Sequence, residues 1–307
     1  MRIAFVDDLC HKKTGSTEFL VDVLNKTNIV KRFWGNGFKK FDKKELGQIN
    51  NWKPDLILFF QRIPNFLILN KFNCKNLVFV PMHDQEIHYG FMERKLLDLS
   101  LFITKTFFKL RVLCFCNADS VYYNNFDLLL VKYYPKPVKS RPILKDKVLF
   151  FWERIDSLPF SKLMEMFDLK QFEKVYFMQR NDAGCECLHH SFYKLPKNVI
   201  VVDNWLSKRN YEKIMNECNI AVAPRLCEGI GHGFLDYMAR GVCIIAYDLP
   251  THNEYIINGF NGILFKNFSY IDLKDWRRFG HNAFDTISMG NERWLIDIDN
   301  ILEWVKN

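Results

Sequence analysis

The sequence predicts an α/β protein of two domains, each built on a parallel β-sheet with helices on both faces. Nine short apolar runs typical of strands recur along the 307 residues, and amphipathic segments such as 16–26 and 210–219 separate several of them. Strands that alternate with helices favour parallel sheets covered on both faces. The strand runs are 2–6, 54–60, 76–82, 120–123, 147–152, 174–179, 198–202, 220–224 and 242–248.

The clearest boundary between domains is the segment 133–147, which holds three prolines and a run of basic residues. Proline disfavours both helices and central strands, and a fresh strand begins where this segment ends. We therefore expect a first domain at 1–140 and a second at 141–280. The remainder, 281–307, is predicted to be a helix that packs back toward the first domain.

Composition excludes several classes of protein. A hydrophobic content of 49% is typical of a globular chain with a real core. No apolar run approaches the roughly 20 residues that span a bilayer, and the first residues are interpreted as a strand rather than a signal peptide. Nine cysteines without a repeating frame favour a reduced, cytoplasmic compartment.

The net charge of +8 is unevenly distributed. Residues 1–145 hold 24 Lys and Arg against 13 Asp and Glu, a net charge of +11, and the remainder has a net charge of −3. A basic first half favours a phosphorylated, acidic or membrane-surface partner.

A glycine-rich turn between a strand and a helix is the clearest candidate site. The strand 220–224 is followed by a loop, a helix at 233–240 and Gly241 as its C-cap. The N-terminus of a helix favours an anion such as phosphate, and glycine lets the backbone approach it closely. Glu228 before the helix and Asp236 inside it add acceptors of the kind that a sugar or ribose needs. The alternative, a tight turn without a ligand, is disfavoured by three glycines in five residues.

This turn and its flanks resemble the signature of the group 1 retaining glycosyltransferases, family four in the usual classification. The resemblance covers about 198–265 and is only topological elsewhere. It implies the GT-B fold, in which two Rossmann-like domains with parallel sheets face one another across a cleft. The matching positions are Pro224, Glu228, Gly229, Gly231, Asp236, Ala239, Gly241, Glu254, Asn261 and Gly262.

The resemblance also implies a role for each part of the turn. Glu228 would accept hydrogen bonds from hydroxyls of the donor sugar. Asp236 would accept from the ribose hydroxyls, although the family has the longer Glu at this position. The backbone amides of Gly229, Ile230, Gly231, His232 and Gly233 would hold the diphosphate.

The family places an Arg and, five residues on, a Lys after the first strand of the second domain, where both neutralise the diphosphate. Arg154 matches the first position, but Pro159 occupies the second. Arg225, just before the glycine loop, or Lys162 would have to replace the missing cation. Losing one preorganised donor of this kind costs about 10²–10³ in rate.

Two residues of the first domain also match the family. Gly15 fits a loop after the first strand, although the family usually has paired glycines there. His83 fits a histidine at the end of a later strand, close to the transferred sugar. A structural histidine is an equally frequent explanation for such a position.

Retaining transfer in this family is drawn as a front-face reaction in which the leaving phosphate oxygen takes the acceptor proton. The resemblance therefore implies neither a carboxylate nucleophile nor a metal or cofactor, because Arg, Lys and the helix N-terminus carry the phosphate charge. The donor is expected to be linked to UDP or GDP. Asp297 and Asp299 have the spacing of a metal motif but lie in the predicted C-terminal helix.

Two basic and aromatic stretches, 31–44 and 92–111, have two interpretations. One is a strand edge and a core helix with solvated lysines. The other is docking on an anionic lipid surface, which would place the chain peripherally on the inner face of the membrane. Nucleic acid is not an expected partner, because the bases form no recognisable binding motif.

The main hypothesis is a retaining glycosyltransferase that moves a sugar from a nucleoside-diphosphate sugar to a glycan or lipid-linked glycan in cell-surface polysaccharide synthesis, such as lipopolysaccharide. The alternative is a non-catalytic GT-B partner subunit that binds a nucleotide-sugar or glycan. A sugar-phosphate epimerase is disfavoured by the intact Glu228 pattern. The cluster Cys185, Cys187, His189 and His190 is interpreted as a loop rather than a zinc site, because its spacing is poor.

Overall fold

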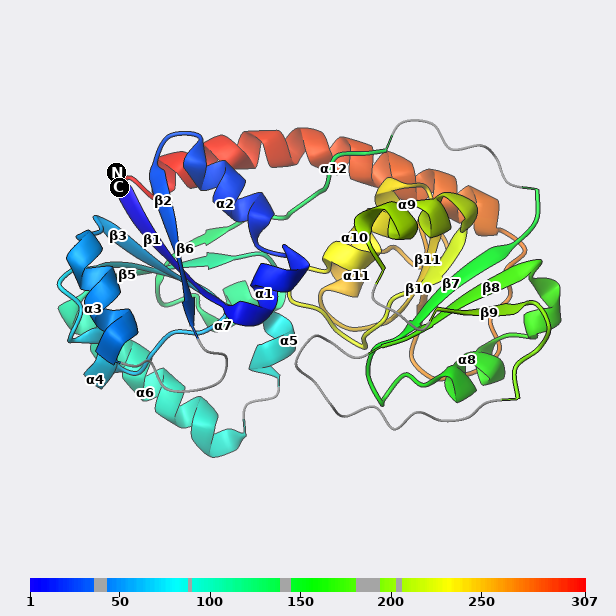
Figure 1. The fold of residues 1–307 in the computed structure, drawn as a ribbon, viewed down its shortest axis with the longest axis horizontal. Coiled ribbons are helices and arrows are strands. Elements are labelled where there is room, and N and C mark those ends of the chain that lie inside the picture. The colour runs from blue at the N-terminus through cyan, green and yellow to red at the C-terminus, as the bar shows by residue number, and fades with distance from the viewer. Residues whose placement is uncertain (36–42, 88–89, 139–144, 181–193, 203–205) are drawn as a thin grey trace. The chain divides into compact units, whose positions relative to one another are not determined.

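The computed structural model describes residues 1–35, 43–87, 90–138, 145–180, 194–202 and 206–307. The chain divides into two compact units (Figure 1). The first comprises Met1–Lys132 together with Trp294–Asn307, and the second is Tyr133–Arg293. The last helix, α12 (Trp276–Trp304), therefore begins in the second unit and ends in the first.

The first unit is built on a six-stranded sheet of order β2-β1-β3-β4-β5-β6, in which all neighbours are parallel. Its strands are β1 (Arg2–Asp8), β2 (Ile29–Gly35), β3 (Leu56–Phe60), β4 (Asn76–Val80), β5 (Lys109–Cys114) and β6 (Asp127–Leu130). Its helices are α1 (Leu9–Thr14), α2 (Glu18–Asn25), α3 (Lys43–Trp52), α4 (Phe66–Leu69), α5 (His83–Glu86), α6 (Phe91–Phe107) and α7 (Asn117–Tyr122).

The second unit has a six-stranded parallel sheet of order β12-β11-β10-β7-β8-β9. Its strands are β7 (Val148–Glu153), β8 (Lys174–Gln179), β9 (Val199–Val202), β10 (Ile220–Val222), β11 (Cys243–Tyr247) and β12 (Ile263–Phe265). Its other elements are α8 (Phe160–Met166), the 3₁₀ turn η1 (Leu169–Gln171), α9 (Lys208–Glu217), α10 (His232–Ala239), α11 (His252–Tyr255) and the first part of α12. Two apolar clusters of buried residues, one containing Phe150 and the other Phe151, form its core.

Each sheet has one point at which the strand order reverses. In the second unit the chain adds β8 and then β9 on one side of β7. It then returns to the other side of β7, where it adds β10, β11 and β12. In the first unit the corresponding point lies between β1 and β3. Ligands in open α/β sheets bind outside the carboxyl ends of the strands at such points. The expected α/β class with two parallel sheets is thus confirmed.

Eight of the nine predicted strands are present, and one prediction was wrong. The run 120–123 lies at the end of α7 instead, because the Cys116 side chain accepts the Asp119 N–H and so caps a helix. Sequence reasoning also missed four strands, β2, β5, β6 and β12. Charged residues interrupt the apolar patterns of β2 and β5, as Lys109 and Arg111 do in β5, whereas β6 and β12 are only four and three residues long.

The C-terminal residues are fixed by a buried arginine of the first unit. The Arg111 side chain, whose residue is 1% exposed, donates to the backbone oxygens of Trp304 and Val305 and to Asn76 Oδ1. Trp294 packs against the rings of Phe19 and Phe115. A charged group inside the fold thus satisfies the carbonyls at the end of α12.

Candidate functional site

A candidate site lies at the carboxyl ends of β7 and β10, where the strand order of the second sheet reverses. Arg154 directly follows β7, and Glu228 lies in the loop after β10. The two strands are hydrogen-bonded neighbours, so the two side chains meet: Arg154 Nη1 lies 3.9 Å from Glu228 Oε1. Their side chains are 20% and 11% exposed, so water screens this pair of opposite charges only in part.

The Arg154 side chain is held from the other side by an aromatic ring. Its guanidinium lies 4.7 Å from the centre of the Trp152 ring, and the Trp152 Nε1 donates to the Arg180 backbone oxygen at 2.6 Å. A cation over an indole face is attracted by the ring quadrupole, which fixes the guanidinium in place. Arg154 is therefore positioned before any ligand arrives.

The glycine loop ends at the N-terminus of α10. Gly231 is the N-cap, with φ of 83°, and a Cβ at this residue would lie 1.9 Å from the Phe234 ring. Only glycine fits such a position. Gly231 offers no side-chain cap, and no acidic residue stands in the first turn of α10. An uncapped helix start without acids favours an anion.

Gly233 differs from Gly231, because nothing in the fold requires it. A Cβ at Gly233 would meet no atom within 4 Å, and its φ is not in the left-handed region. Glycine inside a helix costs about 0.5–1 kcal/mol relative to alanine. A glycine with open space at the second position of α10 leaves room for a ligand to approach the backbone.

The loop is attached to the segment that follows β11. Glu228 N donates to the Pro250 backbone oxygen at 3.4 Å, and Thr251 Oγ1 donates to the Glu228 backbone oxygen at 3.3 Å. His252 is fully buried, and its Nδ1 lies 3.1 Å from the Tyr247 oxygen. Burial lowers the pKa of His252 to about 4, so its imidazole is neutral near neutral pH.

An aromatic ring borders the start of α10. The ring of Tyr133 lies 4.8 Å from that of His232, the first residue of the helix. Burial raises the pKa of Tyr133 to about 12, with a further contribution from the charge of Asp236. The Tyr133 hydroxyl therefore stays protonated at neutral pH.

Asp236 takes part in a network that joins α9 to α10. Its Oδ2 accepts from the Tyr211 hydroxyl at 3.0 Å and from Arg240 Nε at 3.0 Å. Arg240 also donates to both carboxylate oxygens of Glu212, at 2.7 and 3.0 Å. Burial acts to lower the pKa of Arg240, but the bonds to Glu212 and Asp236 outweigh it and raise the pKa above its usual range. Asp236 thus has a structural task that the sequence did not indicate.

The two candidates for the missing cation differ in position. Pro159 is the N-cap of α8 and carries no charge. Lys162 Nζ lies 2.9 Å from Glu165 Oε1, on a half-exposed stretch of α8. Arg225 lies on the same loop as Glu228, three residues before it. Arg225 is therefore the better placed of the two beside the loop.

The last three residues of the matched pattern lie beyond the glycine loop. Asn261 is fully buried; its side chain accepts from Ile257 N at 2.6 Å and donates to the Tyr255 oxygen at 3.0 Å. A Cβ on Gly262 would lie 2.8 Å from Ile244 Cγ2. Both residues thus close a turn, while Glu254 lies in the short helix α11.

In the first unit, Gly15 ends α1 in a left-handed conformation with φ of 67°, and its N–H donates to the His11 oxygen. The neighbouring buried carboxylate of Asp7 binds His11 Nδ1 at 2.5 Å and the Thr17 hydroxyl at 2.7 Å. Burial acts to lower the pKa of His11, but the bonds to Asp7 and Cys10 outweigh it and raise the pKa to about 10. A charged imidazolium therefore lies beside the Gly15 turn. Sequence reasoning predicted Gly15 but missed His11 and Asp7.

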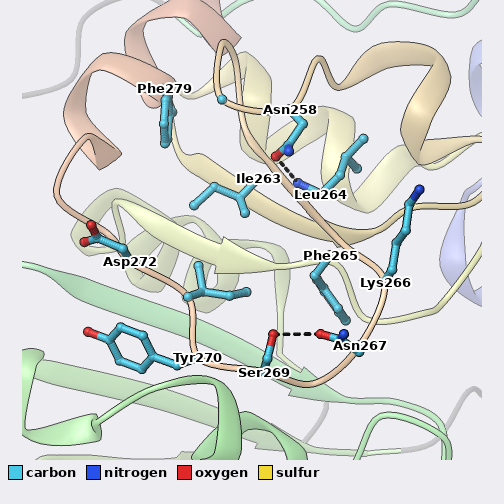
Figure 2. A pocket seen from close by; sticks show the side chains of 12 residues that line it. Asn258, Ile263, Leu264, Phe265, Lys266, Asn267, Ser269, Tyr270, Asp272 and Phe279 are labelled. Carbon is cyan, nitrogen blue, oxygen red and sulfur yellow. Dashed lines mark hydrogen bonds between the residues drawn. The ribbon is translucent and has the colours of Figure 1, made fainter.

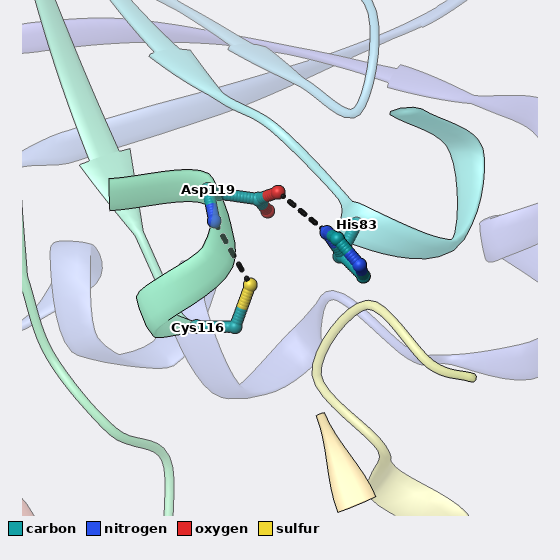
Figure 3. A group of neighbouring side chains, drawn as sticks. All are labelled: His83, Cys116 and Asp119. Atoms are coloured by element: carbon teal, nitrogen blue, oxygen red, sulfur yellow. Dashed lines mark hydrogen bonds and ion pairs between the residues drawn. The ribbon is translucent and has the colours of Figure 1, made fainter. Parts of the chain in front are cut away.

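His83 begins α5 just after β4, and it belongs to a small cluster with Cys116 and Asp119 (Figure 3). His83 Nδ1 lies 3.0 Å from Asp119 Oδ1, and Asp119 N donates to Cys116 Sγ at 3.4 Å. The ligand atoms of the three lie within 4.8 Å of one another, so among the described residues this group could hold a metal ion. Asp119 and Cys116 were not predicted, because they follow a strand that sequence reasoning missed.

A shallow pocket of about 410 Å³ lies beside the edge strand β12 (Figure 2). Its walls include Phe265, Tyr270 and Phe279, and none of the predicted site residues lines it. The cysteines and histidines of the segment 185–190 lie outside the described residues.

The comparisons with known proteins agree with this architecture. The model of the family described as "Glycosyl transferases group 1" matches residues 182–276, which include the glycine loop. No curated protein sequence is significantly similar to the chain.

Solved structures are similar over nearly the whole chain at low sequence identity. Sucrose-phosphate synthase from Thermosynechococcus elongatus superposes with a TM-score of 0.66 at 11% identity, covering 99% of each chain. HepE from Anabaena in complex with UDP has a TM-score of 0.67 at 13% identity, covering 100% of this chain and 98% of its own. A glycosyltransferase from Rickettsia africae has a TM-score of 0.59 at 13% identity, covering 98% of each chain.

Proposed function

We propose that this chain, which has the GT-B fold and the sequence signature of the group 1 glycosyltransferases, transfers a sugar from a nucleoside-diphosphate sugar to a glycan or lipid-linked glycan. The observation that carries the proposal is the meeting of Arg154, Glu228 and the start of α10 at the point where the sheet order reverses. One cation, one sugar-hydroxyl acceptor and one uncapped helix N-terminus are the groups that a sugar diphosphate requires.

In the proposed reaction the bond between the anomeric carbon and the diphosphate oxygen breaks while the acceptor oxygen bonds to the same carbon. The acceptor proton passes to the leaving phosphate oxygen. The charge that develops on the diphosphate is stabilised by Arg154 and by the first amides of α10. Glu228 accepts hydrogen bonds from the sugar, and its neighbour Arg154 keeps its carboxylate oriented. Retention of configuration and independence from metals follow from the resemblance and form part of the proposal.

A uridine nucleotide is the first donor to test. The fold neighbour HepE has been captured with UDP and with UDP-glucose. The second cation is assigned to Arg225, because it lies on the same loop as Glu228, three residues before it. A role in sugar transfer for His83, whose Nδ1 lies 3.0 Å from Asp119 Oδ1, is proposed from the resemblance alone.

The test is turnover of UDP-glucose, UDP-galactose, UDP-N-acetylglucosamine and GDP-mannose by the full chain, with a panel of saccharide acceptors. The expected result is release of nucleoside diphosphate with formation of a glycoside of unchanged anomeric configuration, read by NMR, in the presence of EDTA. Binding of a nucleotide without turnover of any donor would favour the non-catalytic partner subunit, for which the proline at position 159 is the supporting observation.

A further inference from the structure

Helix α6 and its neighbour α4 expose several large apolar side chains in the first unit. We call this set the α6 face. Its members are between 56% and 75% exposed, a large fraction for residues of this type. They are Leu67, Phe91, Met92, Leu96, Leu99, Phe102 and Phe107. Leu67 belongs to α4, which lies beside α6 (Figure 1). The rings of Phe66 on α4 and Phe107 on α6 have centres 5.4 Å apart.

The spacing of these residues shows that the exposure is not accidental. A helix turns about 100° per residue, so Met92, Leu96 and Leu99 lie on one side of α6. The opposite side packs into the core through Leu101 and Thr104, which are buried. The inner side is enough to fix α6 on the sheet, and a helix that faces only water carries polar residues outside. The segment is thus a helix with a buried inner side and exposed lysines, and its outer side also carries large apolar residues.

Helix α6 carries three basic residues, Arg94, Lys95 and Lys105, against two acidic ones. Lys95 is exposed, with its Nζ 4.3 Å from the Phe91 ring, and Lys105 is exposed near the other end of the helix. The two acids of α6 are also exposed, and Glu93 accepts from Gly90 N while Asp98 accepts from the Tyr122 hydroxyl.

We propose that the α6 face docks on a lipid bilayer that contains anionic lipid, with α6 lying in the interface. Apolar side chains would enter the acyl boundary while the lysines meet the headgroups, which is the chemistry of interfacial amphipathic helices. A second copy of this chain fits less well, since it would bring the same lysines face to face. This inference deepens the proposed function, because a docked chain is placed to use a lipid-linked acceptor.

The test is sedimentation of the full chain with vesicles of phosphatidylcholine, with and without phosphatidylglycerol, and without any nucleotide. The wild type is expected to bind the anionic vesicles, and less strongly at high salt. The triple variant Leu96→Ser/Leu99→Ser/Phe102→Ser is expected to partition about tenfold or more weakly. The matched control Leu295→Ser/Ile296→Ser alters side chains that are 57% and 60% exposed on α12, and it should bind as the wild type does.

Equal vesicle binding by the triple variant and the wild type would overturn the proposal. The proposal would also be overturned if the wild type did not bind vesicles and sedimented as a dimer while the triple variant sedimented as a monomer. In that case a second copy of the chain would cover the α6 face. Thermal stabilisation by a nucleotide, measured on the same protein preparations, tests the donor site independently of vesicle binding. A variant that retains that stabilisation is folded.

Discussion

Arg154 Nη1 and Glu228 Oε1 lie 3.9 Å apart at the ends of two neighbouring parallel strands, although the residues are far apart in the sequence. The pair exists because β7 and β10 are adjacent at the one place where the order of the second sheet reverses. It brings a cation that suits a diphosphate beside a carboxylate that suits sugar hydroxyls. The proposed chemistry depends on this relationship.

Replacing Arg154 should remove catalysis and leave the fold intact. Arg154→Ala is expected to lower kcat/KM for the nucleotide-sugar by about 10²–10³, because a donor aimed at the developing diphosphate charge is lost. Arg154→Lys should recover part of the rate, since it keeps the charge but loses the fork geometry. Lys162→Ala is the control, and it should leave kcat/KM nearly unchanged because Lys162 pairs with Glu165. Equal effects of the Arg154 and Lys162 substitutions would contradict the assignment.

Gly233 separates ligand binding from folding. Gly233→Ala should leave the melting temperature unchanged or slightly raised, because the added methyl group meets no atom of the protein. The same methyl group would obstruct a diphosphate, so we expect the dissociation constant for the nucleotide to rise at least about tenfold, by calorimetry. Gly47→Ala in α3, where space is equally open, is the matched control and should not change nucleotide affinity. Unchanged affinity in Gly233→Ala would place the diphosphate elsewhere.

Asp236 should prove important for stability before any role in binding. Asp236→Ala leaves Arg240, a residue only 5% exposed, with Glu212 as its remaining carboxylate partner. We expect a loss of about 1.5–3 kcal/mol in the free energy of unfolding, measured in urea. Glu165→Ala, which breaks the exposed pair with Lys162, should cost at most about 1 kcal/mol. Comparable losses for the two variants would show that the network of Arg240 is not structural.

The buried His252 predicts acid sensitivity of the second unit. Its pKa is about 4 in the folded chain, below the ordinary value of 6.5. As the pH falls below 6.5 the unfolded state gains a proton that the folded state does not, so the free energy of unfolding decreases until about pH 4. The contribution amounts to about 3 kcal/mol. Unfolding measured from pH 7 to pH 4 should show a shallower decrease for His252→Asn, and parallel curves for the two proteins would refute this account.

Sequence reasoning succeeded where the pattern was local. Strands β7 to β11 of the second sheet are short apolar runs, and the glycine turn before α10 has a fixed order of residues, so both could be predicted. It failed where the partner of a residue is distant in sequence. The bond between His83 and Asp119 and the network of Asp236 with Tyr211 depend on which elements become neighbours. No local pattern contains that information.

The same distinction explains the glycines. Gly231 and Gly233 are alike in the sequence, and both were predicted to hold a diphosphate. The fold requires glycine at position 231, because its φ is positive and a Cβ there would clash with the Phe234 ring. The fold places no such requirement on position 233. Space around a residue, which decides between these two roles, is a property of the folded chain alone.

The most direct test of the donor site is the thermal stability of the wild type and Glu228→Ala with UDP, GDP, ADP and CMP. A nucleotide at about 100 times its dissociation constant should stabilise the folded chain by about 2.7 kcal/mol. We predict that one nucleoside diphosphate stabilises the wild type, and that UDP-glucose or GDP-mannose adds a further shift that Glu228→Ala loses. If no nucleotide at millimolar concentration shifts the melting temperature of the wild type, the glycine loop is not a donor site and the central claim is wrong.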